Sequence, residues 1–433
     1  MTRGPHFLIH NKLSWRAVLA AHRQRPDTQR SGDHTLQATD PPMNARPNPR
    51  LVSTSSRLSR RQALQALAAG MAGAALPRLA LATQGANRAV VGAAWRGPRA
   101  GDPNFAGTLV ADWEARKLAF GYTVPLPSRP HGLMAEPGGG LLVCSARPGT
   151  WLLRSDGQGR LTQQIDVQNE GDCRLGGHVI ASADGELLYT TETDFASGKG
   201  KIGVRDRRTL RKIAEWDTHG LDPHQLLLDG QGQLFVANGG IPRTLADRKV
   251  DIHRMDASLV RIDTTNGKLL GKWKVADPRL SLRHMAWSRP PQEEGALLGI
   301  AMQAEHDLEA DRRRAPILAV FDGEDLSIPT RENDGIGYAG DIAPALHDGF
   351  ALSSHQADVA NLWHPGLPDR MRPIIQLKAP YALTGWHGPA DGGGILVATA
   401  YGLGHWHPSA PPNLLAWPEP MALDNHWILI EEA

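Results

Sequence analysis

The stretch 178–192, HVIASADGELLYTTE, places a histidine before a short apolar strand, an Asp-Gly turn and a run rich in β-forming residues. The same order of features recurs as HGLMAEPGGGLLVCSA over 131–146 and as HQLLLDGQGQLFVANGG over 224–240. The histidines that open these copies are 47 and 46 residues apart. A repeat of this length, made of short strands and glycine-containing turns, is typical of the four-stranded blades of a β-propeller.

Looser copies of the phrase begin at His284, Asp341 and Leu383, so that six copies extend from residue 131 to about residue 420. Three strand-like segments between residues 89 and 126, together with the tail NHWILIEE from Asn425, supply one more blade from the two ends of the chain. We therefore predict an all-β chain with a single propeller of seven four-stranded blades, closed by strands from both termini. A six-bladed ring with decorated ends is the alternative.

The next two steps between copies are longer, at 60 and 57 residues. Charged insertions at 305–314 and 322–334 are our explanation for the extra length. We expect these insertions to form loops on one rim of the propeller.

Composition favours one large β-rich body over several helical domains. The 433 residues include 46 Gly and 32 Pro, more than long helices tolerate, and contain no apolar run long enough to cross a bilayer. Residues 83–433 hold 35 basic and 42 acidic groups, a net charge of −7. This sign argues against a nucleic-acid-binding protein.

The N-terminal region has the features of an export signal. Residues 59–64 read SRRQAL, and an Ala-rich apolar run and the sequence Ala-Leu-Ala at 80–82 follow. This order predicts a twin-arginine signal peptide over 43–82, with Met43 as its start, and a periplasmic protein. Residues 1–42 are then a spurious or disordered extension, and 83–433 form the propeller.

The two cysteines, Cys144 and Cys173, form no CxxC or CxxCH motif. This excludes a covalently attached c-type haem and a cysteine zinc knuckle. One disulfide between them is possible in an oxidising compartment, but two unpaired, buried cysteines are the favoured interpretation because Cys144 lies in an apolar strand-like run.

The histidines that open the copies are the candidate site. The first strand of each propeller blade lines the central channel, so these residues should converge together with Asp341 and His426. Grouped imidazoles with a carboxylate are typical ligands of Zn, Cu, Ni or Fe. The alternative is that the histidines bind backbone carbonyls and only tie the blades together. The candidate metal ligands are His131, His178, His224 and His284.

Further polar residues gather around the second, third and fourth copies and extend the candidate ligand-binding set. They are His219, Arg283, Glu192 and Asn238. The last two close the second strands of their blades, which we expect to direct them to the opposite mouth or to a groove between blades. A mixture of Arg, His and carboxylate suits an anion or a metal chelate.

Several motifs resemble a protein family known as domain-of-unknown-function family 1513. They are HG at 131–132, GGH at 176–178, DGELLYTTETD, KIGVRD, THGLDPHQLLL, VANGGI, RKVDIHRMDASLVRID and RHMAW. The resemblance spans about residues 90–405. It implies a twin-arginine-exported, seven-bladed propeller without an assigned reaction. It also implies an iron-related role in the periplasm. The partners that it implies are imelysin-like iron-regulated lipoproteins and a di-haem thiol-oxidoreductase-like protein.

The leading hypothesis is a non-catalytic, monomeric periplasmic propeller that binds Fe, Cu or Zn, or a metal-linked partner, through its histidine-lined mouth. One alternative is a lactonase-like hydrolase with a channel metal and a water, which would need carboxylates such as Glu192 and Asp341. Another alternative is a protein-interaction scaffold, which the fold alone supports.

Overall fold

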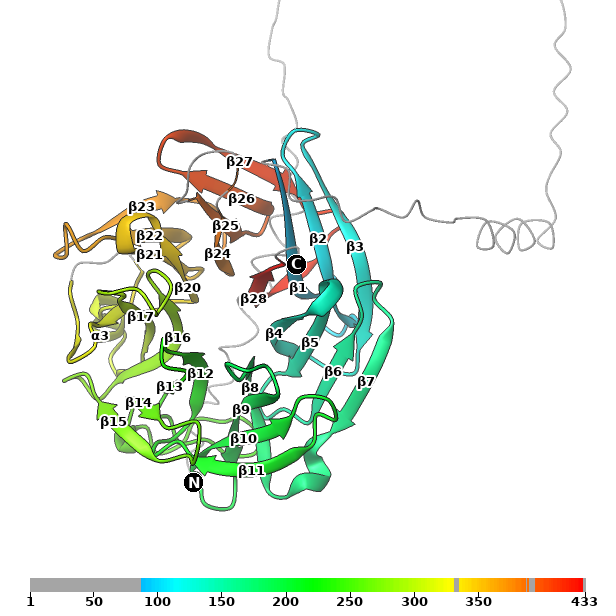
Figure 1. The fold of residues 1–433 in the computed structure, drawn as a ribbon. Helices are drawn as coiled ribbons and strands as arrows, with labels where there is room; N and C mark the ends of the chain where they lie inside the picture. Colours follow the sequence, from blue (N-terminus) through cyan, green and yellow to red (C-terminus); the bar gives the residue numbers. More distant parts are fainter. Residues whose placement is uncertain (1–86, 331–334, 387, 389–393, 431–433) are drawn as a thin grey trace, which may run out of the picture. The chain divides into compact units, whose positions relative to one another are not determined.

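The computed structural model describes residues 87–330, 335–386, 388 and 394–430. The predicted signal peptide and the extension before it lie outside these residues. Seven four-stranded antiparallel sheets follow one another around a ring, as Figure 1 shows in a view along the axis. The predicted all-β fold with seven blades is therefore confirmed.

We number the blades by the chain order of their innermost strands. Blade 1 consists of β4 (Pro130–Glu136), β5 (Gly140–Ser145), β6 (Trp151–Ser155) and β7 (Leu161–Asp166). Blade 2 consists of β8 (Cys173–Ala181), β9 (Leu187–Asp194), β10 (Gly200–Asp206) and β11 (Lys212–Asp217). Blade 3 consists of β12 (Pro223–Leu228), β13 (Leu234–Asn238), β14 (Ser258–Ile262) and β15 (Leu269–Trp273). Blade 4 consists of β16 (Leu280–Trp287), β17 (Leu298–Ala304), β18 (Leu318–Phe321) and β19 (Leu326–Ser327), blade 5 of β20 (Asp341–Ala345), β21 (Gly349–Ser354), β22 (Val359–Trp363) and β23 (Met371–Ile375), blade 6 of β24 (Leu383–Trp386), β25 (Gly394–Ala398), β26 (Gly402–His407) and β27 (Ala410–Ala416), and blade 7 of β28 (Ala422–Leu429), β1 (Arg88–Arg96), β2 (Asn104–Asp112) and β3 (Lys117–Leu126). The helical segments among the described residues are α3 (Glu309–Arg314) and four 3-10 turns, η1 (Pro137–Gly139), η2 (Val167–Glu170), η3 (Ile252–Arg254) and η4 (Leu346–Asp348).

Blade 7 joins the two ends of the described chain. The C-terminal strand β28 pairs antiparallel with the N-terminal strand β1, with Ala422 opposite Arg96 and Leu429 opposite Val91. In Figure 1 the red β28 lies next to β1 at the inner edge of the ring. This pairing leaves no open sheet edge between the first and last blades and replaces the six-bladed alternative.

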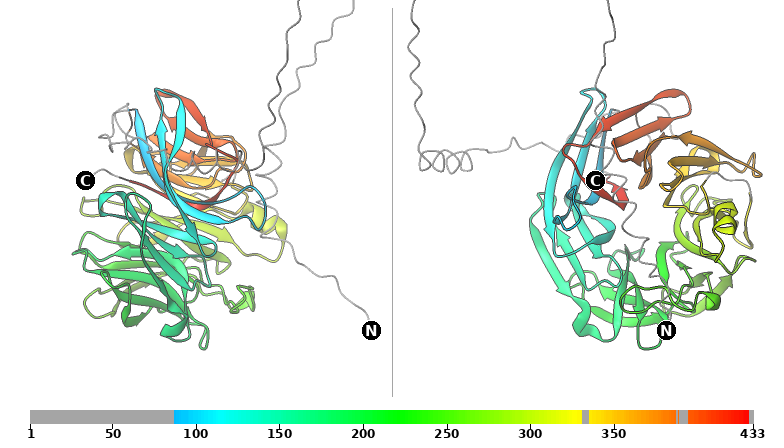
Figure 2. Two further views of the ribbon diagram at one scale, coloured as in Figure 1. Left: turned by 90° about the vertical axis from the view of Figure 1, so that its right-hand side faces the viewer. Right: turned by 180° about the vertical axis from the view of Figure 1, so that it is seen from behind.

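Apolar layers between successive blades form the core. In the layer between blades 3 and 4, for example, Phe235 and Leu259 pack with Ile300 and Phe321. The innermost strands also contact one another in ring order, from β4 through β8, β12, β16, β20 and β24 to β28 and back to β4. Figure 2 shows the same ring from the side and from behind. Side chains on seven consecutive inner strands are therefore brought to a common axis.

The explanation for the longest repeat step was wrong. The step of 60 residues ends at His284, before either proposed insertion, and its extra length lies in the connection 239–257 between β13 and β14. The insertion at 305–314 follows β17 and includes α3, so it lengthens the next step instead. Part of the second insertion forms the turn before β19 and β19 itself, and residues 331–334 lie outside the described residues.

Both cysteines are free and buried, so the favoured interpretation of two unpaired thiols is confirmed. Cys144 lies in the middle strand β5, and the Cys173 thiol donates to Glu215 Oε2 at 3.3 Å. None of the helices in the described part of the chain has the length and apolar character needed to cross a bilayer.

Candidate metal centre on the propeller axis

Five inner strands contain an irregularity in their pairing, and a histidine lies at each one. The register with the second strand shifts at a β-bulge in β4, β8, β12, β16 and β28. The inner strands of blades 5 and 6 pair without a shift. A bulge redirects the side chain of its extra residue, which explains how these strands turn a histidine toward the axis. The five residues are His131, His178, His224, His284 and His426.

Glycines next to the histidines permit close approach of the inner strands. Gly177 has φ +113°, and a Cβ atom there would lie 2.7 Å from Cδ2 of His131. A Cβ on Gly132 would lie 2.4 Å from the carbonyl oxygen of Gly177. The HG and GGH motifs therefore place two imidazoles against each other where any larger residue would separate them.

The five imidazoles form one buried group, which we call the histidine cluster. In nine of the ten pairs of rings, the centroids lie between 4.0 Å, for His284 and His426, and 6.1 Å, for His131 and His284. All five residues are less than 9% exposed. One nitrogen from each of His131, His178, His224 and His284 lies within 4.8 Å of the others. The structure thus brings all four predicted metal ligands together and adds His426.

The nitrogen atoms of this cluster have fewer partners than they need. Nδ1 of His284 lies 2.8 Å from the carbonyl oxygen of Gly340, which can only accept, so this nitrogen carries the proton. In a neutral ring Nε2 then has a single lone pair. Nε2 of His224 and Nε2 of His426 both lie 2.7 Å from that atom. One lone pair cannot accept two well-aligned hydrogen bonds.

Two further nitrogens have no hydrogen-bond partner among the described residues. They are Nε2 of His178 and Nδ1 of His224, and both are buried. An unpaired buried polar atom costs about 1–3 kcal/mol. Tying blades together explains the Nδ1 contact of His284, which joins blade 4 to the segment before blade 5, but it does not explain these atoms.

Carboxyl groups lie close to Nδ1 of three of the imidazole rings. Asp424 Oδ1 lies 3.5 Å from Nδ1 of His131. Asp341 Oδ1 lies 3.5 Å from Nδ1 of His284 and 3.7 Å from Nδ1 of His426. Metal-binding histidines commonly have such a group beside the ring nitrogen that faces away from the ion, where it fixes the orientation of the imidazole.

Burial keeps the cluster uncharged. Burial first, and then neighbouring positive charges, holds the pKa of His178, His224, His284 and His426 well below 6.5, and burial also lowers the pKa of His131. The neutral imidazole is the form that binds a metal. Burial raises the pKa of Asp341 to about 8, so this carboxyl is protonated at neutral pH.

The structure does not bring His219, Glu192 or Asn238 into this cluster. His219 is exposed in the turn after β11. Glu192 is buried in ion pairs with Arg205 at 2.7 Å and Lys212 at 2.8 Å. The Asn238 amide donates to the carbonyl of Thr218 at 3.0 Å and to the hydroxyl of Ser258 at 3.2 Å.

Of the two positions predicted for Glu192 and Asn238, the opposite mouth was wrong. Antiparallel pairing places the end of a second strand beside the start of the first. Glu192 is opposite Leu175, and Asn238 is opposite Pro223. Both residues therefore lie toward the mouth where the inner strands begin.

At that mouth, Arg283 belongs to a partly buried ionic group, which we call the arginine cluster. Its members are Arg147, Arg243, Arg283, Asp222 and Asp247. Asp222 accepts from Arg147 at 3.2 Å and from Arg243 at 3.1 Å on one oxygen, and from Arg283 at 3.1 Å on the other. Asp247 pairs with Arg147 and Arg243, each at 3.0 Å. Sequence reasoning found only Arg283, although Asp222 stands in the quoted motif THGLDPH.

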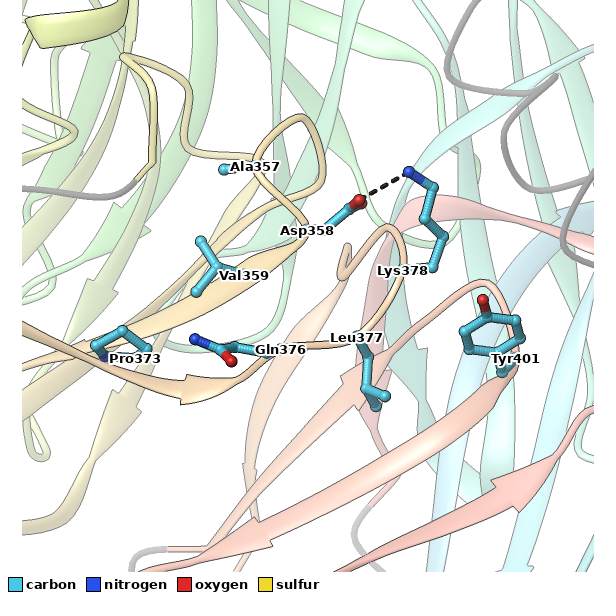
Figure 3. Close-up of a pocket in the computed structure, with 8 residues that line it drawn as sticks. All are labelled: Ala357, Asp358, Val359, Pro373, Gln376, Leu377, Lys378 and Tyr401. Carbon is cyan, nitrogen blue, oxygen red and sulfur yellow. Dashed lines mark hydrogen bonds and ion pairs between the residues drawn. The ribbon is translucent and has the colours of Figure 1, made fainter.

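A shallow groove of about 570 Å³ lies along β22 and β23 and reaches the connection after β23 and the turn after β25 (Figure 3). Its one ion pair is satisfied, because Lys378 Nζ lies 2.7 Å from Asp358 Oδ2 and the other Asp358 oxygen accepts from the amide of Ala379. No member of the histidine cluster lines this groove. We therefore assign it no part in the candidate site.

The fold and the axial site define a seven-bladed β-propeller with five buried histidines at its centre. The model of the family described as "Protein of unknown function (DUF1513)" matches residues 124–430. The chain belongs to this family, which the sequence motifs had indicated. No curated protein sequence matches the chain.

Solved structures with low sequence identity share the architecture. Kuenenia stuttgartiensis hydrazine synthase is 15% identical, with a TM-score of 0.50, over 73% of this chain and 92% of that chain. A catalytically inactive virginiamycin B lyase from Staphylococcus aureus, solved with quinupristin, is 12% identical, with a TM-score of 0.46, over 66% of this chain and 84% of that one. At 15% identity the likeness to hydrazine synthase indicates the propeller fold alone.

Proposed function

We propose that this protein is a periplasmic metal-binding propeller that holds one transition-metal ion on its axis through the histidine cluster. The supporting observation is the shortage of partners around Nε2 of His284. Nε2 of His224 and Nε2 of His426 both lie within hydrogen-bonding distance of this atom, which has one lone pair. A cation accepts lone pairs from several nitrogens at once. Metal binding therefore satisfies the cluster in a way that hydrogen bonds between its members cannot.

The dimensions of the cluster suit a single ion. Metal–nitrogen bonds of about 2.1 Å place two ligands on opposite sides of an ion about 4.2 Å apart. The four-histidine set lies within 4.8 Å, whereas Nε2 of His224 and Nε2 of His284 are 2.7 Å apart. Binding one ion therefore requires the more distant rings to move slightly inward and these two rings to move slightly apart. Neutral imidazoles bind Zn, Cu, Ni and Fe, and the general order of affinity puts Cu(II) first. An iron-handling role beside imelysin-like or di-haem partners is part of the proposal and rests on the family resemblance.

The hydrolase alternative has weaker support. It needs carboxylate ligands at the channel metal, and the candidate Glu192 is engaged with Arg205 and Lys212 away from the histidines. Asp341 is the one proposed carboxylate that adjoins the cluster. We therefore favour binding over catalysis.

Metal analysis of the purified protein tests the proposal. Chelator-treated protein should take up one equivalent of Cu(II) or Zn(II) in isothermal titration calorimetry. The electron paramagnetic resonance spectrum of the Cu(II) form should show coupling to several imidazole nitrogens. The variant His219→Gln is the control and should bind equally, because this histidine is exposed. Protein that retains no metal and takes up none of Cu(II), Zn(II), Ni(II) or Fe(II) contradicts the proposal.

Cell fractionation tests the proposed location. The protein should appear in the periplasmic fraction, and replacement of Arg60 and Arg61 by lysine should retain it in the cytoplasm. Co-purification with an imelysin-like or di-haem protein from the same fraction would support the iron-related role.

A further inference from the structure

We propose that the arginine cluster is a binding site for a carboxylate ligand at the mouth of the channel. The site uses residues other than the histidines, so it goes beyond the metal proposal and can be tested without any metal. The ligand is a small carboxylic acid, either free or as part of an anionic metal complex.

The charges inside the arginine cluster do not balance. Three guanidinium groups, from Arg147, Arg243 and Arg283, share the two carboxylates of Asp222 and Asp247. The neighbouring cations have their own partners, since Lys249 pairs with Glu305 and Arg129 pairs with Asp424. One positive charge is therefore left without a counter-charge inside the cluster.

The surplus falls on a residue that is almost completely buried. Arg283 is 1% exposed, and its Nε has no hydrogen-bond partner among the described residues. Its single ion pair, to Asp222, is shared with two other arginines. A buried charge without full compensation is unfavourable for folding. Retaining such a group is expected at a functional site, where a ligand supplies the missing charge.

The surrounding backbone is built to hold this arginine. Arg283 lies in the bulge of β16, next to His284, and therefore at the edge of the histidine cluster. A Cβ atom on Gly239 would lie 3.0 Å from Nη1 of Arg283 and 2.8 Å from the nearer Asp222 oxygen, so only glycine leaves room there. The Ser281 hydroxyl donates to the carbonyl of the same glycine at 2.7 Å.

Guanidinium chemistry selects the class of ligand. Arginine presents a planar group of N–H donors that matches the two oxygens of a carboxylate. One carboxylate neutralises the single surplus charge, whereas a phosphate dianion would leave an excess negative charge beside Asp222. A positively charged mouth also attracts an anionic complex more strongly than a bare metal cation.

Titration of the metal-free, full-length protein with acetate, a monocarboxylate, at constant ionic strength, tests this site. We expect saturable binding with one molecule per chain. Binding should weaken at least tenfold in Arg283→Gln and should be unchanged in Arg160→Gln, an exposed arginine on the β6–β7 turn. Because the first substitution removes an unbalanced buried charge, the metal-free variant should melt no lower than the wild type.

Further arms distinguish the outcomes. If Arg283→Gln does not fold, Arg147→Gln takes its place, since this side chain is partly exposed. Ferric citrate that binds more tightly than citrate identifies a metal complex as the ligand, and equal binding identifies the free acid. Absence of acetate binding, loss of less than twofold in the variant, or an equal response to phosphate overturns the proposal. Failure of metal uptake by the histidines leaves this test unaffected.

Discussion

Replacing His284 by leucine should remove most of the stabilisation that a bound metal gives to this protein. His284 is the central member of the histidine cluster, because its Nε2 lies 2.7 Å from the corresponding atoms of both His224 and His426. Leucine has a similar volume but no nitrogen. The substitution therefore removes one ligand and the shared contact of two others.

The size of the effect follows from linkage. A metal at 100 times its dissociation constant adds about 2.7 kcal/mol to the free energy of unfolding. A ring of about 340 residues has an unfolding entropy of roughly 0.7 kcal/mol per degree, so the melting temperature should rise by about 4 °C. Loss of a direct ligand should weaken metal binding at least about 100-fold. This is the largest loss of metal affinity expected from removing a group that only supports a ligand. At the same metal concentration, the bound metal then stabilises the variant by only about 0.4 kcal/mol, which raises its melting temperature by less than about 1 °C.

Differential scanning fluorimetry of chelator-treated protein, with and without Cu(II) or Zn(II), measures both shifts. His219→Leu is the matched control and should keep the full metal-dependent increase. The metal-free His284→Leu protein should melt somewhat below the wild type, because the hydrogen bond from Nδ1 to the carbonyl of Gly340 is lost. The metal-dependent increase is therefore measured against the metal-free form of the same variant. If this variant retains the full increase with metal, the axial histidines are not the ligands.

Three further predictions concern parts of the fold around the site. Arg205→Met should lower the free energy of unfolding by about 3–5 kcal/mol in urea denaturation, because Glu192 keeps its buried charge but loses one of two cations; an effect below about 1 kcal/mol contradicts this. Burial alone would raise the pKa of Glu192, but the ion pairs outweigh burial and lower it. The stabilisation that Glu192 contributes should therefore be complete above about pH 4.3 and be lost as the pH falls through the lower folded value. Below about pH 4.3 the stability of Glu192→Gln should consequently decline less than that of the wild type. Burial raises the pKa of Cys144 and of Cys173 to about 12, so neither thiol should react with iodoacetamide at pH 8 until the protein unfolds, and rapid labelling of native protein would contradict their burial.

The sequence contained enough information for the fold, because the repeat is a physical unit. Each copy consists of four strands joined by turns, and the spacing of His131, His178 and His224 in the three clearest copies shows this unit directly. The closing blade could be predicted as well, since the segments near both ends have strand character and no other partners. The position of the long insertion could not, because the connection 239–257 has no pattern of its own.

The histidine cluster was predictable for the same reason, whereas the arginine cluster was not. Periodic positions on inner strands converge by symmetry, and His426 belongs to the same series. The residues Arg147, Arg243 and Asp247 lie in connections whose course depends on tertiary contacts. A better signal existed for Glu192: Gly203 interrupts the opposite strand, and a Cβ there would lie 2.0 Å from the Glu192 carboxylate. A glycine inside a strand indicates that another group approaches the backbone closely at that position. At Gly203 this group is the Glu192 carboxylate, which pairs with Arg205.

The pairing of β28 with β1 also has a consequence for when the site comes into existence. These strands are more than 300 residues apart in the chain, and β28 carries His426 and Asp424. His426, the fifth member of the histidine cluster, can therefore join the other four only after nearly the whole polypeptide has been synthesised. A chain that is truncated or nicked before this strand lacks both ring closure and a complete ligand set, so loading with metal would report that the molecule is full-length and correctly folded.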